Sequence, residues 1–358
     1  MKNKLALALL LSFTFSALHS TVALAWGERG HHMICEISTR LVSEPELQKF
    51  LLKRGDTLGH VCNLPDISWR SLGPIAESGN AAHFMNSEDG GITVDQAPTD
   101  VSAYLSLLKS ADPLSKKADQ LGTLWWRAQQ FYNSAVTAGK NLATTAPPDS
   151  DHAQDPNDVY NKSVFTFLTN LGLMGHFVGD ASMPFHNTTD YDGWQTGHGG
   201  IHSFYETECV SFFDSSLAQD VATAAKTIRE QREATELPNK IKMVEMGTMV
   251  DLIKAVSVAS FGEKTQVTDL DEVLERSSIS TDKSGKPVKN YAKRKPYADA
   301  CPAFRPLIVQ QLARSVALMS KLIDRAYIEA GRPNLKSYKA YTYPLDLTFV
   351  PLNYLNQN

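Results

Sequence analysis

The sequence predicts a mainly α-helical protein, and three observations support this fold class. Apolar residues recur at helical spacing over several long stretches. Segments in which apolar and polar residues alternate, as strands require, are scarce. Polar loops rich in proline and aspartate separate the helical stretches, and no internal repeat is visible. We therefore expect an all-α fold with long loops, formed by a single domain over residues 26–358 with a polar insertion at about 263–300.

The first 25 residues have the pattern of a secretory signal peptide. Two lysines precede an apolar stretch of about 11 residues, and Ala23-Leu24-Ala25 provides a small-x-small cleavage site. This stretch is shorter than the ~20 residues needed to span a bilayer, and no later segment is longer. We expect an exported protein, secreted or in transit through a periplasm, without a transmembrane segment and with Trp26 as its first mature residue.

The helices follow from apolar spacing and from their start signals. A proline two residues after Ser43 restarts the first segment, and Asp100 precedes the second as a helix cap. Trp125-Trp126 in the second segment could form a substrate platform, but core packing is favoured. In chain order the expected helical segments are 31–53, 100–139 as one or two helices, 161–179, 215–262 with a break near Pro238, and 302–330.

Charge and cysteine content exclude some functions. Removing Lys2 and Lys4 leaves 33 basic and 39 acidic side chains, a net charge of −6. Such a chain lacks the broad basic surface that duplex binding requires, so we expect no stable nucleic-acid partner. The basic run that ends the insertion is interpreted as a solvated face. Four cysteines, without a Cys-x-x-Cys pair, predict two disulfides and leave all three pairings open: Cys35, Cys62, Cys209 and Cys301.

Two segments combine histidines and carboxylates at the spacing of one helical turn. In MGHFVGDASMPFH, His176 and Asp180 are four residues apart and His186 follows a helix-ending proline. In IHSFYE, His202 and Glu206 are again four apart. Imidazole nitrogens and carboxylate oxygens are a ligand set suited to zinc. Capping and surface ion pairing could explain one such pair, but the combination predicts a metal centre.

Further donors lie upstream. Asp66 occurs in CNLPDISW, a turn-like setting after a proline, and His83 begins a short apolar stretch in NAAHFMN. Cleavage after Ala25 would expose the α-amine of Trp26 beside its own carbonyl oxygen, and these two atoms can chelate a metal ion. His31 lies about one helical turn away and can add a nitrogen. Metal binding would require the amine to lose its proton.

The ordered set W-x4-H, Asp, H-F, H-x3-D-x5-H and H-x3-E resembles one superfamily. It joins the zinc-dependent bacterial phospholipases C with the fungal-type single-strand-specific nucleases, and the resemblance covers residues 26–206. It implies a mainly helical fold that binds three Zn²⁺ in one cleft, and hydrolysis of a phosphodiester. The implied ligand sets are Asp66, His83, His176 and Asp180; the Trp26 amine and carbonyl, His31 and a bridging Asp180; and His186, His202 and Glu206.

The resemblance also implies roles for other residues. Asp66 is the candidate catalytic residue that orients or deprotonates the attacking water. His198, four residues before His202, is the main rival ligand, but Gly199-Gly200 is expected to break the helix between them. Aromatic residues near the ligands could hold a quaternary ammonium, stack bases or simply pack. The substrate-binding candidates are Phe84, Trp194 and Tyr205, with Trp69 and Tyr191 also near the ligands in sequence.

The two branches of the superfamily differ outside the metal ligands. Glu206 and the Gly199-Gly200-Ile201 segment favour the phospholipases C, since the nucleases carry Asp and Gly-Gly-Asn there. The W-x4-H spacing is instead nuclease-like. We expect a monomeric, secreted phospholipase C that acts on phosphatidylcholine-like phospholipids at a membrane surface and releases diacylglycerol and a phosphorylated head group. The alternative is a single-strand-specific zinc nuclease or 3′-nucleotidase. A lesser alternative is a non-catalytic zinc-stabilised binding protein with closed sites.

Overall fold

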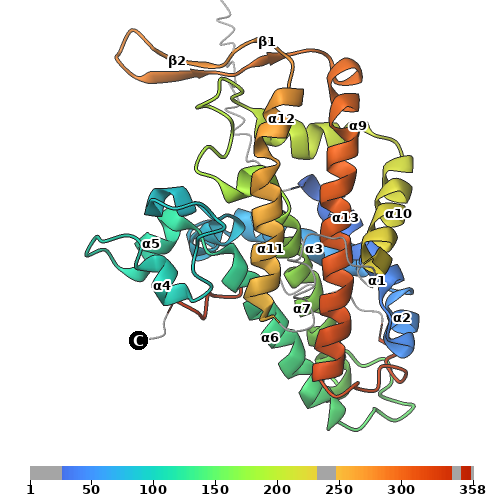
Figure 1. The fold of residues 1–358 in the computed structure, drawn as a ribbon. Helices are drawn as coiled ribbons and strands as arrows, with labels where there is room; N and C mark the ends of the chain where they lie inside the picture. The colour runs from blue at the N-terminus through green and yellow to red at the C-terminus, as the bar shows by residue number, and fades with distance from the viewer. Residues whose placement is uncertain (1–25, 232–246, 341–347, 356–358) are drawn as a thin grey trace, which may run out of the picture.

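A computed structural model describes residues 26–231, 247–340 and 348–355. The expected signal peptide and the break near Pro238 lie outside these residues. The described chain is mainly α-helical, which confirms the fold class (Figure 1). Its α-helices are α1 (Gly27–Leu41), α2 (Pro45–Leu51), α3 (Gly55–Leu64), α4 (Val101–Leu105), α5 (Leu114–Leu121), α6 (Leu124–Ala143), α7 (Val159–Ala181), α8 (Ile201–Ser203), α9 (Val210–Phe212), α10 (Ser216–Gln231), α11 (Met249–Gly262), α12 (Lys264–Leu270) and α13 (Tyr297–Glu329).

Helix α7 is the centre of the bundle. It packs against α6, α3, α1, α11 and α13, and its C-terminal half is almost entirely buried. The carboxylate of Asp158 caps its first turn by accepting hydrogen bonds from the Tyr160 and Asn161 amides. Gly175 lets α7 pack closely against α1, because a Cβ at this position would overlap the sulfur of Cys35. A helix that is buried on so many sides can hold polar side chains away from water.

Several start signals that the sequence predicted are present. Pro45 lies in the first turn of α2, and Asp100 caps α4 through the Ala103 amide. Trp125 and Trp126 are buried in the core, as expected. The expected segment 100–139 is three helices rather than one or two, and α13 begins five residues earlier than expected, carrying two prolines in its first ten residues.

Two disulfides resolve the cysteine pairing that the sequence left open. Cys35 on α1 is bonded to Cys62 on α3, and Cys209 is bonded to Cys301 on α13. The first disulfide joins two helices that flank α7, and the second ties the segment after α8 to the longest helix. Both therefore cross-link elements that surround the bundle centre.

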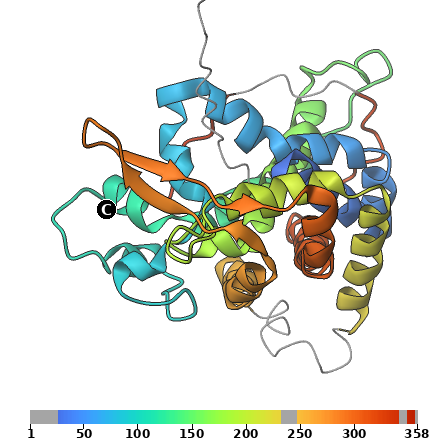
Figure 2. The same ribbon diagram turned by 90° about the horizontal axis from the view of Figure 1, so that it is seen from above.

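The polar insertion contains all the strands of the described residues. Strands β1 (Val273–Glu275) and β4 (Lys293–Arg294) pair antiparallel, as do β2 (Ser278–Thr281) and β3 (Pro287–Asn290). The β2–β3 hairpin extends away from the helical body in both views (Figures 1 and 2). No helix among residues 26–231, 247–340 and 348–355 is long and apolar enough to cross a membrane.

Candidate metal centre

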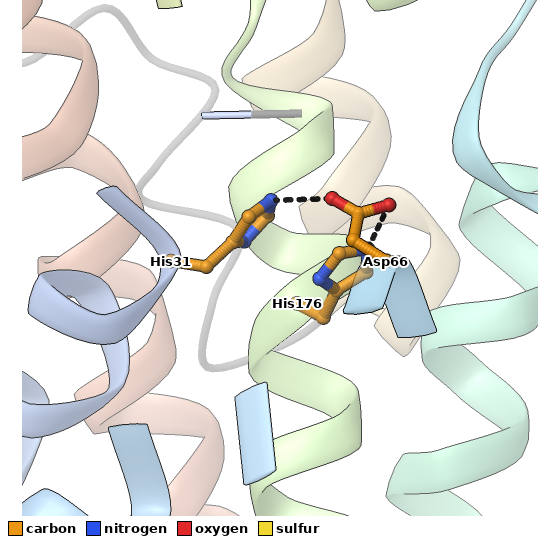
Figure 3. A group of neighbouring side chains, drawn as sticks. All are labelled: His31, Asp66 and His176. Carbon is orange, nitrogen blue, oxygen red and sulfur yellow. Dashed lines mark ion pairs between the residues drawn. The ribbon is translucent and has the colours of Figure 1, made fainter. Parts of the chain in front are cut away.

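Three helical elements bring the first predicted ligands together (Figure 3). His31 comes from α1, and His176 and Asp180 come from α7 one turn apart. Asp66 lies in a π-helical turn, Pro65–Trp69, that continues α3, and not in the turn-like setting that the sequence suggested. Single π-helical turns are frequent at functional sites. We call the resulting cluster the Asp180 group; its members are His31, Asp66, His83, His176 and Asp180.

Asp180 is the centre of this group. Its Oδ1 lies 3.3 Å from His31 Nε2, and its Oδ2 lies 3.0 Å from His83 Nδ1 and 3.4 Å from His176 Nε2. Asp66 faces the same three rings at 3.7 to 4.0 Å and forms an ion pair with Arg70 at 2.9 Å. All of the group's side chains are buried.

A second cluster, the Glu206 group, consists of His186, His202 and Glu206. The Nε2 atoms of the two histidines are 3.0 Å apart, and Glu206 Oε2 lies 3.1 Å from His202 Nε2 and 3.7 Å from His186 Nε2. His186 Nδ1 is 3.9 Å from Asp180 Oδ1, so the two groups adjoin. The structure thus assembles every predicted histidine and carboxylate ligand in one place.

Backbone carbonyls fix the tautomer of three of the histidines. The Nδ1 of His176 donates to Cys62 O at 2.8 Å, that of His202 to Tyr191 O at 2.6 Å, and that of His186 to His83 O. A carbonyl oxygen can only accept, so Nδ1 carries the proton in each ring. In the neutral rings Nε2 therefore directs a lone pair into the cluster, as is usual for metal-binding histidines.

Burial sets the direction of the pKa shifts in both groups. It lowers the pKa of His83, His176 and His186 well below the usual value, which favours neutral rings. Burial acts the same way on His202, but the Glu206 carboxylate outweighs it and raises the pKa.

The carboxyl groups shift in the opposite direction. Burial raises the pKa of Asp180 well above its usual range, reinforced by the charge of Glu206, and raises that of Asp66 to about 7 although Arg70 opposes this. Burial also raises the pKa of Glu206. A nearby cation would compensate for these costs of burying carboxylates.

The donor atoms fit a divalent cation. Within the described part of the chain, Asp180 Oδ1 and Glu206 Oε1 are buried and accept no hydrogen bond. The His186 and His202 lone pairs face each other at 3.0 Å, an arrangement that needs a proton or a cation between them. Three donor sets are compact enough to hold a metal: His31, Asp66 and His176; His83, His176 and Asp180; and His186, His202 and Glu206.

These sets differ in one respect from those implied by the resemblance. The third set is the same, and His83, His176 and Asp180 belong together as implied. His31, however, forms a compact set with Asp66 and His176, which were assigned to a different zinc. His31 stacks on His176, with ring centroids 4.0 Å apart, and its Nε2 also lies 3.3 Å from Asp180 Oδ1, the pairing that the resemblance implies.

Trp26 is anchored beside both groups. Its side chain is completely buried, and its indole Nε1 donates to Gly179 O at 2.8 Å and to Ser182 Oγ at 3.0 Å. Its backbone nitrogen lies 3.0 Å from Glu206 Oε2, and its carbonyl accepts from the Gly30 amide. The aromatic side chain thus fixes the position of the backbone nitrogen at the carboxylates.

The clusters open onto a cavity of about 560 Å³. His83, His186 and His202 line it. The other lining residues are Arg70, Asn80, Phe84, Asn86, Phe185 and Tyr191. Of the aromatic residues that the sequence analysis names near the ligands, Phe84 and Tyr191 line this cavity. An open cavity beside the metal ligands does not match the closed sites of a purely structural zinc protein.

Tyr205 and Trp194 do not line the cavity, so their assignment as substrate-binding residues is corrected. Tyr205 is completely buried, packs near Trp26, and donates its hydroxyl hydrogen to Gln311. It adjoins Glu206 in sequence, but successive helical residues point in different directions. Trp194 packs edge-on against Tyr291, with ring centroids 5.1 Å apart, and its indole donates to Asp192.

Sequence reasoning missed the polar residues of the cavity wall. Arg70 could have been found from its i, i+4 spacing with Asp66, which places it on the same helical face. Asn80 and Asn86 flank His83 but carry no distinctive spacing. Their convergence depends on the irregular 3₁₀ segments Arg70–Ile75 and Glu77–His83, which the apolar pattern does not predict.

A buried cluster outside the ligands holds the segment before His202. Asp271 accepts hydrogen bonds from Arg294 at 2.9 Å and lies 2.9 Å from His198 Nδ1. Arg294 also donates to His198 O at 2.7 Å. Gly200, at φ 91°, then turns the chain into α8. His198 is therefore engaged by Asp271 and does not join the Glu206 group.

Comparison with known proteins gives little information on identity. No protein-family profile matches the chain. The chain is 22% identical over 261 residues to a protein of Bradyrhizobium tropiciagri described as a probable serine protease. The match covers 52% of this chain and spans about a third, 31%, of that protein.

Proposed function

We propose that the protein is a secreted zinc-dependent phospholipase C that hydrolyses the glycerol-side phosphodiester of phosphatidylcholine-like lipids. The observation that carries the metal-dependent part is the His186–His202 pair. Both rings have their Nδ1 protons committed to carbonyls, so both Nε2 lone pairs converge on one buried carboxylate. Together with the Asp180 group and the adjoining cavity, this arrangement supports a hydrolytic metal centre.

The two groups would hold three zinc ions. The Glu206 group would hold one, and the Asp180 group, with the Trp26 amine and carbonyl, would hold the other two. Bound zinc would supply Lewis-acid polarisation of the phosphate and activation of water at neutral pH. The chain's own contribution is to fix the donors: Nδ1–carbonyl hydrogen bonds orient the imidazoles, and burial keeps most of them neutral.

The cavity wall suggests how a phosphodiester would be oriented. The Arg70 guanidinium lies at the mouth of the Asp180 group, where it can donate to phosphate oxygens. Asn80 and Asn86 add amide donors. Asp66 faces His31, His83 and His176 at 3.7 to 4.0 Å and is the candidate to orient or deprotonate the attacking water. Arg70 would thus position the phosphodiester, and Asp66 would accept the proton of the attacking water.

Aromatic residues support a lipid head group as the substrate. Phe84, Phe185 and Tyr191 line the cavity together, and aromatic faces attract a quaternary ammonium. The nuclease alternative keeps one supporting observation, the nuclease-like spacing of Trp26 and His31, and the same aromatics could stack bases. The partial match to a probable serine protease is compatible with a hydrolase, but it does not indicate which bond is hydrolysed.

A paired assay tests the proposal. The zinc-loaded protein is incubated with phosphatidylcholine vesicles and, separately, with denatured DNA. Release of phosphocholine without nucleotides is the expected result, and release of nucleotides alone would transfer the proposal to the nuclease branch. Metal analysis should find close to three zincs per chain. A chelator should abolish activity and lower the melting temperature by roughly 5–10 °C, because removing a ligand at 100 times its Kd withdraws about 2.7 kcal/mol.

A further inference from the structure

The β2–β3 hairpin is joined directly to the segment that carries His202. At its base, Ser277 N donates to Gly197 O at 2.8 Å and Ala292 N donates to Gly199 O at 3.1 Å. Arg276 adds a hydrogen bond to Thr196 O. The same segment supplies Tyr191 and His202 to the cavity wall. The hairpin therefore projects from the rim of the cavity and not from a remote surface.

Charges at the base of the hairpin are neutralised, and charges towards its tip are not. Lys293 pairs with Glu275 at 2.7 Å, Lys295 pairs with Glu272, and Arg294 pairs with Asp271. In contrast, Lys283 and Lys286 form no ion pair with an acidic side chain of the described chain. The Asp282 carboxylate, directly before Lys283, accepts hydrogen bonds from the Ser284 and Lys286 amides and so shapes the turn.

Apolar side chains accompany the unpaired lysines. Ile279 on β2 is 63% exposed, and Leu274, Val288 and Tyr291 are also exposed. Every residue of β2 and β3 is exposed, so Ile279 and Val288 are not part of the hydrophobic core. Exposed aliphatic residues beside lysines are typical of elements that lie in the interface of an anionic bilayer. A nucleic-acid surface would not require the aliphatic ones.

We propose that the β2–β3 hairpin, residues 278–290, docks the protein on anionic phospholipid bilayers. Lys283 and Lys286 provide attraction to anionic head groups, and Ile279 enters the interface. Docking there places the cavity rim at Tyr191 against the lipid surface. The inference deepens the proposed phospholipase function, but docking itself does not require hydrolysis.

Vesicle binding tests this proposal with the intact metal-loaded protein. The vesicles contain phosphatidylserine and phosphatidylcholine analogues in which a methylene group replaces the glycerol-side oxygen, so that bond cannot be hydrolysed. Replacing Lys283 and Lys286 by Gln should weaken binding to serine-containing vesicles by about 10- to 30-fold, since each basic residue contributes on the order of 1 kcal/mol at such a surface. Ile279→Ser should weaken binding to choline-only vesicles as well, because aliphatic contact does not depend on lipid charge.

The matched control makes the same charge change elsewhere. Lys140 and Lys162 are exposed at the end of α6 and the start of α7, away from the hairpin (Figure 1). Their replacement by Gln should leave vesicle binding within two-fold of the original protein. Equal effects of the two double variants would overturn the proposal. So would a hairpin variant that loses affinity for single-stranded oligonucleotides but keeps vesicle binding. Hairpin-dependent binding without release of a head group from natural phosphatidylcholine would support docking while refuting the proposed function.

Discussion

The Asp180 group and the Glu206 group use the same donor types but are held in different ways. The Asp180 group draws its side chains from α1, α7, the π-helical turn after α3 and the 3₁₀ segment Glu77–His83. Helices α1 and α3 pack against α7 and are cross-linked by the Cys35–Cys62 disulfide. The Glu206 group comes from one short stretch, residues 186–206, outside the central helices. The Asp180 group is therefore part of the core, whereas the Glu206 group depends on contacts from outside residues 186–206.

The supports of the Glu206 group come from distant parts of the chain. Trp26 N contacts Glu206 at 3.0 Å, and the Asp271–Arg294 pair fixes the segment before His202. We infer that the Asp180 group is the more robust site and that the Glu206 group responds to changes made far from it in sequence.

The largest expected effect separates the two groups directly. Asp180→Asn should lower turnover on the order of 1,000-fold and reduce the zinc content of the Asp180 group by up to two ions, because one carboxylate oxygen faces His31 and the other faces His83 and His176, as expected of a ligand that bridges two metals. Glu206→Gln should remove only one zinc. Metal analysis with turnover measures both, and Asp112→Asn, on an exposed carboxylate, is the control. Full zinc content and activity in Asp180→Asn would refute its bridging assignment.

A second test concerns the nitrogen of Trp26. Adding one glycine before Trp26 in the matured protein should reduce turnover on the order of 100-fold, since an amide nitrogen cannot bind the cation that a free amine can. The buried indole should keep the chain end in place, so the melting temperature should change little. Turnover and zinc content are measured for the protein that begins at Trp26 and for the form with the added glycine. An extended form with full activity would contradict the terminal-amine ligand.

A third test weakens the contacts of Asp271, which hold the segment before His202, and leaves the predicted ligands unchanged. Asp271→Asn should lower zinc affinity at the Glu206 group by roughly 10-fold, because losing a hydrogen bond between charged groups, about 1.5–3 kcal/mol, loosens the segment that positions His202. The Asp180 group should be unaffected, which sharpens the contrast between the groups. Competition with a chelator measures each affinity, and Asp269→Asn, exposed on the same segment, is the control. Equal weakening of both groups would show that the supports are shared.

The smallest effect tests the corrected role of Tyr205. Tyr205→Phe removes the hydrogen bond to Gln311 and should cost about 1 kcal/mol of unfolding free energy. Turnover should stay within two-fold, because the ring faces Trp26 and the core. Denaturant unfolding and a turnover assay measure the two quantities. A large fall in kcat/KM without loss of stability would show that Tyr205 belongs to the substrate site after all.

The sequence predicts the helices and the clustering of the candidate ligands well, because both depend on local spacing. His176 and Asp180, and His202 and Glu206, meet across one helical turn wherever the helix lies. The apolar period likewise places α7 and α13 close to their observed bounds.

Contacts between distant segments could not be predicted in the same way. The Asp271–His198 pair, 73 residues apart, depends on how the insertion folds back. His31 stacks on His176, and packing against α13 sets the direction of Tyr205. Each of these follows from tertiary packing, which local periodicity does not encode.

The disulfides have a consequence for when the centre can form. Cys35 follows His31 by four residues, Cys62 precedes Asp66 by four, and Cys209 follows Glu206 by three. Disulfide formation therefore cross-links the helical turns that carry these predicted metal ligands. In a chain exported as proposed, a reducing cytosol would keep those turns unclamped, and the producing cell's own lipids would be spared until the enzyme had left.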